Sequence, residues 1–309
     1  MCCGSTRATR NTSTGFADID TVHSLPSWRP TADVAALTAR GQLLADIREF
    51  FRRLDVLEVQ TPVLMPDTVT EPMIDSIAVM GGGWLQTSPE YAMKRLLAAG
   101  APAIYQLGPV FRAGERGRWH NPEFTLLEWY RPGFDDQQLM QELASLVDAL
   151  LGAASYRQVT YGDLVDDDLS GDDADLAYAE ACAALEGRCF VTHFPRAQAS
   201  LARLHANGET AARFELIVAG VELANGYHEN GDAVQLRERF TADNARRRGL
   251  GKTEINLDEA FLAANAHGIP SCAGVAVGVD RLLVLQQGGR HIEEVLAFPA
   301  LSTTRPVSP

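Results

Sequence analysis

The clearest hydrophobic periodicity in the chain predicts a long amphipathic helix from Val34 to Leu54. Its apolar residues recur every three or four positions, and mainly charged residues separate them. The apolar face is assigned to Leu37, Leu43, Leu44, Ile47, Phe50, Phe51 and Leu54. A short strand, Val56–Val59, is expected next. Similar spacing of leucines predicts a second helix over Gln137–Leu151.

Short runs of strand-forming residues predict two hairpins. One joins Ile77–Met80 to Trp84–Thr87 across three consecutive glycines. The other joins Ala103–Leu107 to Phe124–Tyr130 across a polar loop that contains several arginines. Arginine suits bidentate recognition of phosphate, so this loop is interpreted either as a phosphate-binding loop or as a solvated hairpin tip.

A third helix is predicted to begin at Ser88-Pro89-Glu90. Serine is a favoured N-cap residue, proline a favoured first helical residue, and an acid suits the positive end of the helix dipole. Its buried face is assigned to Met93, Leu96 and Leu97. Gly100 has the residue type expected just after the helix.

Two strands are predicted at Phe214–Val218 and Val221–Leu223. Asn225-Gly226 then predicts a turn, which would bring Glu222 and Glu229 together. Paired carboxylates with phosphate oxygens are a common way to hold Mg²⁺. The alternative for Glu222 is an ordinary strand residue.

The glycine-rich segment Cys272–Leu285 predicts a strand followed by an apolar helix. Its glycines would allow a ligand to approach the backbone closely. Arg281 would lie near the start of that helix, where phosphates bind favourably.

Two other charged segments are less specific. Gly152–Phe190 is rich in Asp and Ala, and a solvated helical insertion is preferred over a metal site because EF-hand spacing is absent. Arg237–Arg248 ends in three arginines, which indicates either a solvated helix face or a docking patch for an acidic partner.

Composition indicates an ordinary globular chain. The 309 residues are 46% hydrophobic and 22% charged, which fits one large or two modest domains. The net charge of −13 lacks the basic surplus that binding to tRNA phosphates requires, and it favours a small-molecule or protein substrate.

The cysteines and the apolar runs indicate a cytoplasmic protein. The number of cysteines, five, is odd and no CxxC motif occurs, so neither a disulfide framework nor a structural zinc site is expected. No apolar run is long enough to span a membrane, and the first residues have no signal-peptide core. Residues 1–27 are polar and are predicted to be a disordered extension.

The second hairpin resembles motif 2 of the class II aminoacyl-tRNA synthetases in its lysyl form. The matching residues are Phe111-Arg112, His120–Thr125 and Glu128–Tyr130, with the loop length kept. The first helix and strand resemble motif 1, and Cys272–Leu285 resembles motif 3. The resemblance extends over roughly residues 28–299 and implies an α+β fold in which helices flank an antiparallel sheet. It also implies one catalytic domain over 28–309, with a variable insertion around 152–190, and a homodimer built by motif 1.

This resemblance implies that the chain activates an amino acid as an adenylate, with ATP and Mg²⁺. Arg112 and Arg281 would be the catalytic residues, and Mg²⁺ would bind Glu222 and Glu229. The residues implied to bind ATP are Arg112, Ala113, Gly114, Glu115, His120, Asn121, Glu222, Leu223, Gly278 and Arg281. The chain departs from the family at motif 2, where the usual acid follows the arginine by two residues. Here that position is Gly114, and Glu115 comes one residue later.

The resemblance also implies a pocket for a diamino acid, whose ammonium groups would meet carboxylates. The residues assigned to it are Ser88, Pro89, Glu90, Tyr130, Glu229 and Ala276. Lysyl-tRNA synthetases have glycine where this chain has Ala276. The added methyl group would disfavour α-lysine and is compatible with a β-amino acid.

Among the lysyl enzymes, the chain is most similar to a truncated, ligase-type paralogue. That paralogue transfers (R)-β-lysine to a lysine ε-amine of elongation factor P, the implied protein partner. About 27 residues precede the match, so no anticodon-binding domain is expected, and tRNA would be a poor acceptor. The first alternative is a free-standing enzyme that acts on RNA. The second is a non-catalytic regulatory paralogue, which would be expected to lose the implied arginines and glutamates that this chain keeps.

Overall fold

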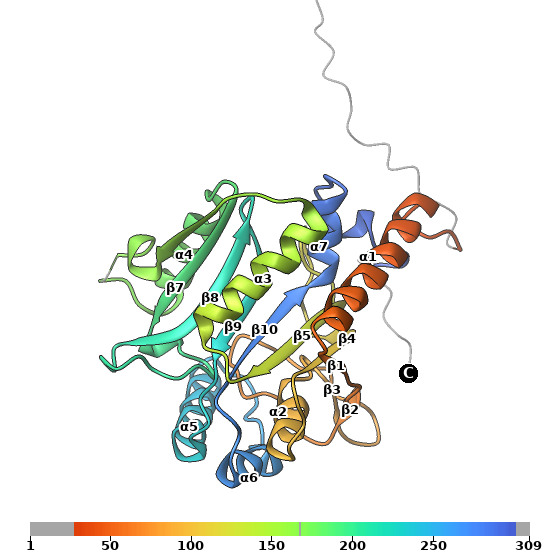
Figure 1. Ribbon diagram of the computed structural model, residues 1–309. Coiled ribbons are helices and arrows are strands. Elements are labelled where there is room, and N and C mark those ends of the chain that lie inside the picture. The colour runs from red at the N-terminus through yellow and green to blue at the C-terminus, as the bar shows by residue number, and fades with distance from the viewer. Residues whose placement is uncertain (1–27, 167, 301–309) are drawn as a thin grey trace, which may run out of the picture.

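A large, mostly antiparallel sheet forms the centre of the computed structural model, which describes residues 28–166 and 168–300 (Figure 1). The predicted extension 1–27 lies outside the described residues. Within them the main sheet has eight strands in the order β1-β4-β5-β10-β9-β8-β7-β6, and only the β1–β4 and β6–β7 pairs are parallel. The strands are β1 (Leu57–Glu58), β4 (Ile104–Phe111), β5 (Glu123–Pro132), β6 (Tyr156–Thr160), β7 (Arg188–Pro195), β8 (Thr210–Val218), β9 (Val221–His228) and β10 (Cys272–Gly278). The implied α+β fold is confirmed.

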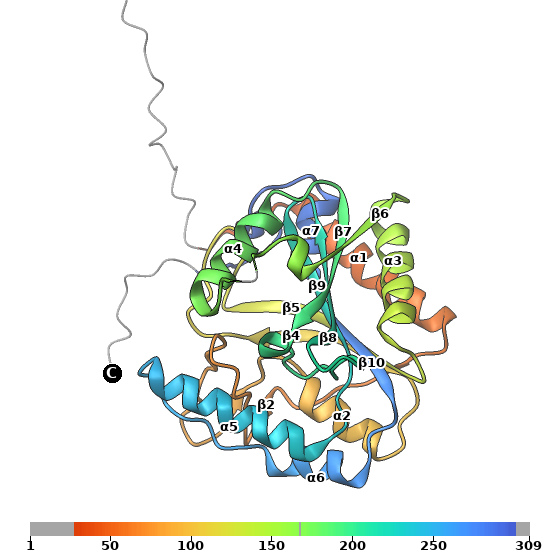
Figure 2. The same cartoon turned by 90° about the vertical axis from the view of Figure 1, so that its left-hand side faces the viewer.

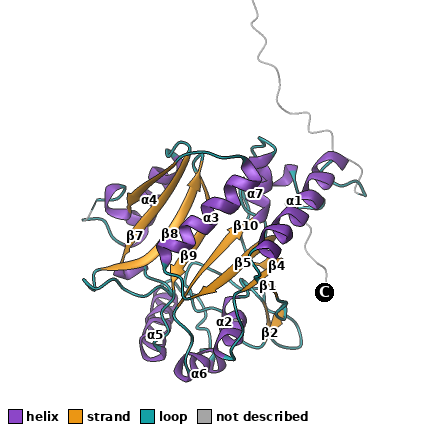
Figure 3. Cartoon of the chain, viewed as in Figure 1, coloured by secondary structure: helices purple, strands orange, loops and turns teal. Residues whose placement is uncertain are grey.

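Helices lie on both faces of this sheet (Figures 2 and 3). Those described are α1 (Val34–Arg53), α2 (Glu90–Ala98), α3 (Asp136–Leu151), α4 (Gly171–Ala183), α5 (Ala233–Gly249), α6 (Glu259–His267) and α7 (Val279–Gln286), with short 3₁₀ turns at Tyr161–Asp163, Arg196–Gln198 and Ile292–Glu294. Helices α1 and α3 lie on the right of the sheet in Figure 2, and α4 and α5 lie on the left. No helix in the described ranges is both long and apolar enough to cross a bilayer.

Helix α1 confirms the first periodicity, except that Leu37 and Leu54, which were assigned to its apolar face, are each 38% exposed. Asp33 caps it by accepting a 2.8 Å hydrogen bond from the backbone N–H of Ala36. Phe51 is fully buried, stacks on Tyr105 at 4.4 Å between ring centroids and meets Trp129 edge-on at 5.2 Å. Burial of one such side chain contributes about 1.5–3 kcal/mol, so this face fixes α1 to the sheet.

The start of α2 differs from the prediction. The helix begins at Glu90 with Pro89 in the N-cap position, and no side chain caps it. Ser88 therefore precedes the N-cap position by one residue and does not cap the helix. Leu96 is 37% exposed rather than buried. Gly100 does end the helix, with a φ of 92° that favours glycine.

The turn predicted at Asn225-Gly226 is wrong, because β9 continues through both residues. Asn225 pairs with Ala276 of β10. A β-carbon on Gly226 would lie 2.3 Å from the ring of Phe214. The glycine is thus required by close packing within a strand rather than by a turn.

The helical interpretation of 152–190 was incomplete. This segment contains α4, but it also contains β6 and the start of β7, the last two strands at one edge of the sheet. The hairpin predicted near Gly81 is present: Ala78 pairs antiparallel with Trp84, and the N–H groups of Val79 and Leu85 donate to the carbonyls of Gly83 and Ile77. Trp84 and Leu85 also form strand β3, which pairs with β2 (Leu64–Met65).

Candidate active site

The register of the central strands gathers polar residues on one face of the sheet. Gly274 of β10 aligns with Tyr130 of β5, and Ala276 aligns with Glu128 of β5 and Asn225 of β9. Because side chains alternate between the two faces of a strand, these residues share the face opposite α1 and α3. The intervening residues, such as Trp129, belong to the apolar core. One face of the sheet therefore packs against the apolar core, and the other face carries the polar residues of the candidate site.

Several buried charges gather at one end of this face. Lys94 of α2 is 1% exposed, and its Nζ lies 2.6 Å from Glu90 Oε1 and 2.5 Å from Glu229 Oε2. Glu128 is 3% exposed and accepts a 2.8 Å hydrogen bond from the Tyr130 hydroxyl. Two carboxylates thus contact a single lysine, whose charge also acts on the third, Glu128.

Burial shifts the ionisation of this cluster. Burial raises the pKa of Glu128 to about 8, and the charge of Glu90 adds to that rise. Burial also raises the pKa of Glu229 to about 8, although Lys94 opposes the rise. Burial alone would lower the pKa of Lys94, but Glu229 and Glu90 raise it overall. The cluster is therefore an acidic pocket that holds protons near neutral pH and favours cationic ligands.

A second group of polar side chains lies around Arg281. Arg281, in the first turn of α7, donates to the Glu222 carbonyl at 2.7 Å and lies 3.4 Å from the Glu222 carboxylate. Its other terminal nitrogen lies 2.8 Å from His120 Nε2. Burial and the charge of Arg281 lower the pKa of His120, so the imidazole accepts this hydrogen bond in its neutral form. Three of the residues assigned to ATP, Arg281, His120 and Glu222, therefore lie in contact with one another.

Arg112 follows directly after β4, and its guanidinium lies 5.1 Å from the ring centre of Phe124. Its Nη1 lies 3.6 Å from Glu115 Oε1. Gly114 between them has a φ of 76°, a conformation that would strain a glutamate. The displaced motif 2 acid therefore reaches the arginine because the loop turns at this glycine.

The other residues assigned to ATP have more limited contacts. Asn121 is buried and its amide binds the Glu123 carbonyl at 2.5 Å and the Ala300 N–H at 2.8 Å, so it also anchors its own loop. The N–H of Ala113 donates to a backbone carbonyl at 2.6 Å. Leu223 points into the apolar core, and only its backbone is available to a ligand.

Two other assigned residues lie beside these groups. Ser88 and Pro89 line a small hollow with Thr87 and Asp258, next to the start of α2. A β-carbon on Gly278 would lie 3.5 Å from the side chain of Arg281, which folds back over this residue.

The structure does not bring Glu222 and Glu229 together. They occupy the two ends of an extended strand, and seven residues at ~3.3 Å each separate them by roughly 20 Å. Since no turn intervenes, the two carboxylates do not form the expected pair, and Mg²⁺ binding by Glu222 and Glu229 stays a prediction. Only Glu222 lies at the end that contains Arg281.

Glu215 of β8 lies closer to Glu222 along the sheet than Glu229 does, because Glu222 pairs with Ile217, two residues from Glu215. Burial and the charge of Glu222 raise the pKa of Glu215. No cluster of three or more His, Cys, Asp or Glu side chains suited to a metal occurs among residues 28–166 and 168–300. Two carboxylates nevertheless fit Mg²⁺, which usually completes its shell with phosphate and water oxygens.

Sequence reasoning overlooked Lys94, Glu128 and Glu215. Two of them had a signal: Lys94 follows Glu90 by four residues on a helix, a spacing typical of ion pairs. Glu215 precedes Glu222 by seven residues, and the two predicted strands are separated only by Ala219 and Gly220, which places both acids near one end of a hairpin.

The basic cluster at the end of α5 is neutralised within the chain. Arg246 lies 3.5 Å from Asp172, and Arg248 lies 2.7 Å from Glu254. Arg247 is 5% exposed and binds Asp75 at 3.3 Å. These pairs give no support to a docking patch, and Arg247 is not part of a solvated face.

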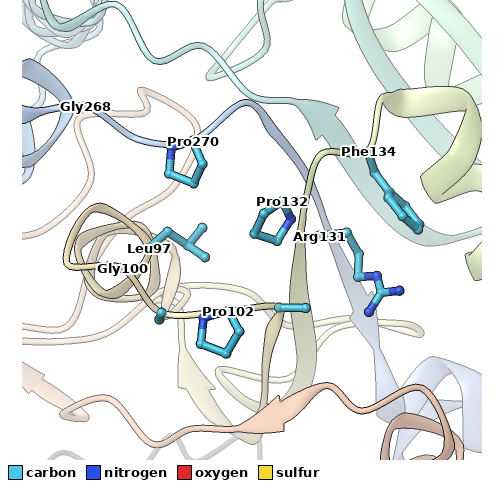
Figure 4. A pocket seen from close by; sticks show the side chains of 10 residues that line it. Leu97, Gly100, Pro102, Arg131, Pro132, Phe134, Gly268 and Pro270 are labelled. Carbon is cyan, nitrogen blue, oxygen red and sulfur yellow. The ribbon is translucent and has the colours of Figure 1, made fainter.

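A hollow of about 600 Å³ lies outside both groups (Figure 4). It opens between the end of α2, the start of β4 and the end of β5, where Leu97, Pro102 and Pro132 line it. Arg131 lies over the ring of Phe134 at 4.7 Å beside it. Its lining includes none of the residues assigned to ATP or to the amino acid.

Comparison with known proteins gives a consistent family. Residues 26–302 match the model of the family described as tRNA synthetases class II (D, K and N). The elongation factor P–(R)-β-lysine ligase of Vibrio cholerae is 41% identical over an alignment 315 residues long. The alignment covers 88% of this chain and 97% of that protein. The proteins of the same name from Proteus mirabilis and Edwardsiella ictaluri are 40% and 41% identical, and each comparison covers 89% of this chain and 98% of the relative.

Proposed function

The chain belongs to the class II tRNA synthetases of the D, K and N type and to the elongation factor P–(R)-β-lysine ligases among them, and from this premise we propose its reaction. It activates (R)-β-lysine with ATP as an adenylate and transfers the amino acid to a lysine ε-amine of elongation factor P. The observation that supports this substrate best is the set of three carboxylates formed by the buried Glu128 and Glu229 and the half-buried Glu90.

The acidic pocket would bind the two ammonium groups of the diamino acid. Buried carboxylates make strong charge-assisted hydrogen bonds to ammonium groups, and they strongly disfavour an uncharged side chain that leaves them unpaired. Tyr130 would fix the orientation of Glu128, to which its hydroxyl is bonded. Ala276, aligned with Glu128, would restrict the room beside the substrate backbone.

Positive charge would promote the first step, in which the substrate carboxylate attacks the α-phosphate of ATP. Two anions must approach each other, so preorganised cations should contribute most to catalysis. Arg112 would bind the α-phosphate and the carboxylate, and Arg281 with His120 would bind the distal phosphates. Asn121 and the backbone of Leu223 would help to place the nucleotide.

Glu222 and Glu215 would hold Mg²⁺. The ion would supply charge neutralisation at the phosphates and favour departure of pyrophosphate. Glu222 is the more accessible of the two, because its side chain is 46% exposed whereas Glu215 is 4% exposed. Tyr178 of α4 donates a 2.7 Å hydrogen bond to Glu215, and Arg213 lies 2.6 Å from it, so this carboxylate is held firmly.

A homodimer is part of the proposal. Strand β1 is an edge strand, and large apolar side chains near it are exposed, among them Leu54, Leu57 and Leu64 at 38%, 52% and 51%. Edge strands with apolar neighbours are usually covered. Sedimentation equilibrium would test this: a monomer at micromolar concentration would contradict it, and Leu57→Lys should weaken a dimer.

The test of the reaction is an ATP-dependent gain in mass on purified elongation factor P. (R)-β-lysine and α-lysine are offered separately, with bulk tRNA as a parallel acceptor. One lysyl-sized addition to the protein, larger with the β-amino acid and absent from tRNA, is expected. Charging of tRNA without change to the protein would support the RNA-directed alternative. Absence of both products and of pyrophosphate exchange would indicate a non-catalytic protein.

A further inference from the structure

Lysine is rare in this chain, and one of its lysines lies inside the acidic pocket. Of the 27 lysine and arginine residues in the chain, only Lys94 and Lys252 are lysines. Lys252 binds Asp75 at the surface, whereas the Lys94 side chain is 2% exposed. Arginine is used almost everywhere else, so position 94 has a specific need for a lysine.

The geometry around Lys94 explains that need. Its Nζ lies within 2.6 Å of carboxylate oxygens of both Glu90 and Glu229. The rings of Tyr130 and Phe261 lie 5.9 and 6.0 Å from the same nitrogen. A compact ammonium fits between these groups, and the larger planar guanidinium of arginine would not.

The net charge of the pocket depends on this one residue. Fully ionised, Glu90, Glu128 and Glu229 bring three negative charges, and Lys94 neutralises one of them. The remaining two match a ligand with two ammonium groups. A ligand with a single ammonium group would leave a buried charge unpaired, which costs several kcal/mol.

We propose that Lys94 is a positioning residue that serves as a fixed internal cation of the amino acid pocket. It holds Glu90 and Glu229 in place and sets the pocket to accept two ammonium groups. This inference rests on the proposed function. Lys94 itself does not contact the reacting atoms, and it acts through the two carboxylates that it bridges.

The test shortens the Lys94 side chain so that an added amine can occupy the vacated space and restore its function. Lys94→Ala leaves a gap with the shape of propylammonium. Calorimetry should show at least about a tenfold weaker binding of (R)-β-lysine, as expected when a charged hydrogen bond worth ~1.5–3 kcal/mol is lost, with ATP binding unchanged. Propylammonium chloride should restore most of this affinity, whereas tetramethylammonium chloride at equal ionic strength should not. Lys252→Ala is the matched control, and the amine should not alter it.

A second variant covers a failure of the first to fold. Lys94→Met keeps all but the last heavy atom of the side chain and removes its charge. It should bind (R)-β-lysine as weakly as Lys94→Ala while its circular dichroism stays native, and propylammonium should not rescue it because no gap exists.

Two results would overturn the role of Lys94: wild-type affinity in Lys94→Met, or a native Lys94→Ala protein whose binding the amine does not restore. Wild-type protein that binds no diamino acid would instead contradict the proposed function. The wild-type titration therefore separates the two failures.

Discussion

Glu222 and Glu229 lie at opposite ends of strand β9, and each faces a different cation. Glu222 lies beside Arg281, and Glu229 lies beside Lys94. Since roughly 20 Å of extended backbone separates them, we expect the two carboxylates to contact different ligands.

Substitution of these two glutamates should therefore give different kinetic changes. Glu222→Gln should reduce kcat of (R)-β-lysine-dependent pyrophosphate exchange by about 10–100-fold, as for loss of a metal-ligand contact, and should raise the Mg²⁺ requirement. Glu229→Gln should raise KM for the amino acid by about 10–100-fold through loss of a charge-assisted contact, with KM for ATP little changed. The same pattern in both variants would mean that the two residues share one ligand after all.

Ala276 should govern the choice between amino acids. It lies between Glu128 and Asn225 in the sheet, and its side chain adds one methyl group to the site face. Ala276→Gly should reduce the preference for (R)-β-lysine over α-lysine by about tenfold, since one methylene in a pocket is worth ~1–3 kcal/mol. The ratio of the two kcat/KM values measures this. Ala273→Gly, on the opposite face of the same strand, is the control and should leave the ratio unchanged.

Binding of the diamino acid should strengthen as pH rises. In the empty pocket Glu128 and Glu229 have pKa values of about 8, so both are largely protonated below that pH. Ammonium groups favour the ionised carboxylates, so binding of the diamino acid releases protons from the pocket. Between pH 6 and 8, each proton released should increase the affinity by up to about tenfold for every pH unit. Calorimetry in buffers of different ionisation enthalpy would count these protons. Glu128→Gln should release fewer, and an affinity that is constant with pH would contradict this account.

Gly226→Ala should destabilise the fold. Its β-carbon would lie 2.3 Å from the Phe214 ring, which is fully buried between β9 and the helices. Overpacking of this kind costs about 1–3 kcal/mol in the free energy of unfolding. Denaturant titration measures the loss, and Gly226→Ala combined with Phe214→Leu should recover part of it. Gly108→Ala, where a β-carbon meets nothing within 4 Å, is the control.

Local patterns predicted the elements whose signals lie within a few residues. The periodicity of 34–54 became α1, and the two strands around the arginine-rich loop became β4 and β5. The same local reasoning failed at Asn225-Gly226. A glycine required by the Phe214 ring is indistinguishable in sequence from a glycine required by a turn, because the ring comes from another strand.

The sequence alone determined the family, through short motifs whose order and spacing are visible along the chain, and with it the arginines and acids near the site. Only the tertiary structure decided which of those acids act together. Strand register placed Glu128 beside Ala276, and helix packing inserted Lys94 between Glu90 and Glu229. The Glu128–Ala276 and Lys94–Glu229 contacts join residues more than 100 positions apart, and the charges of these residues depend on burial, which no local pattern specifies.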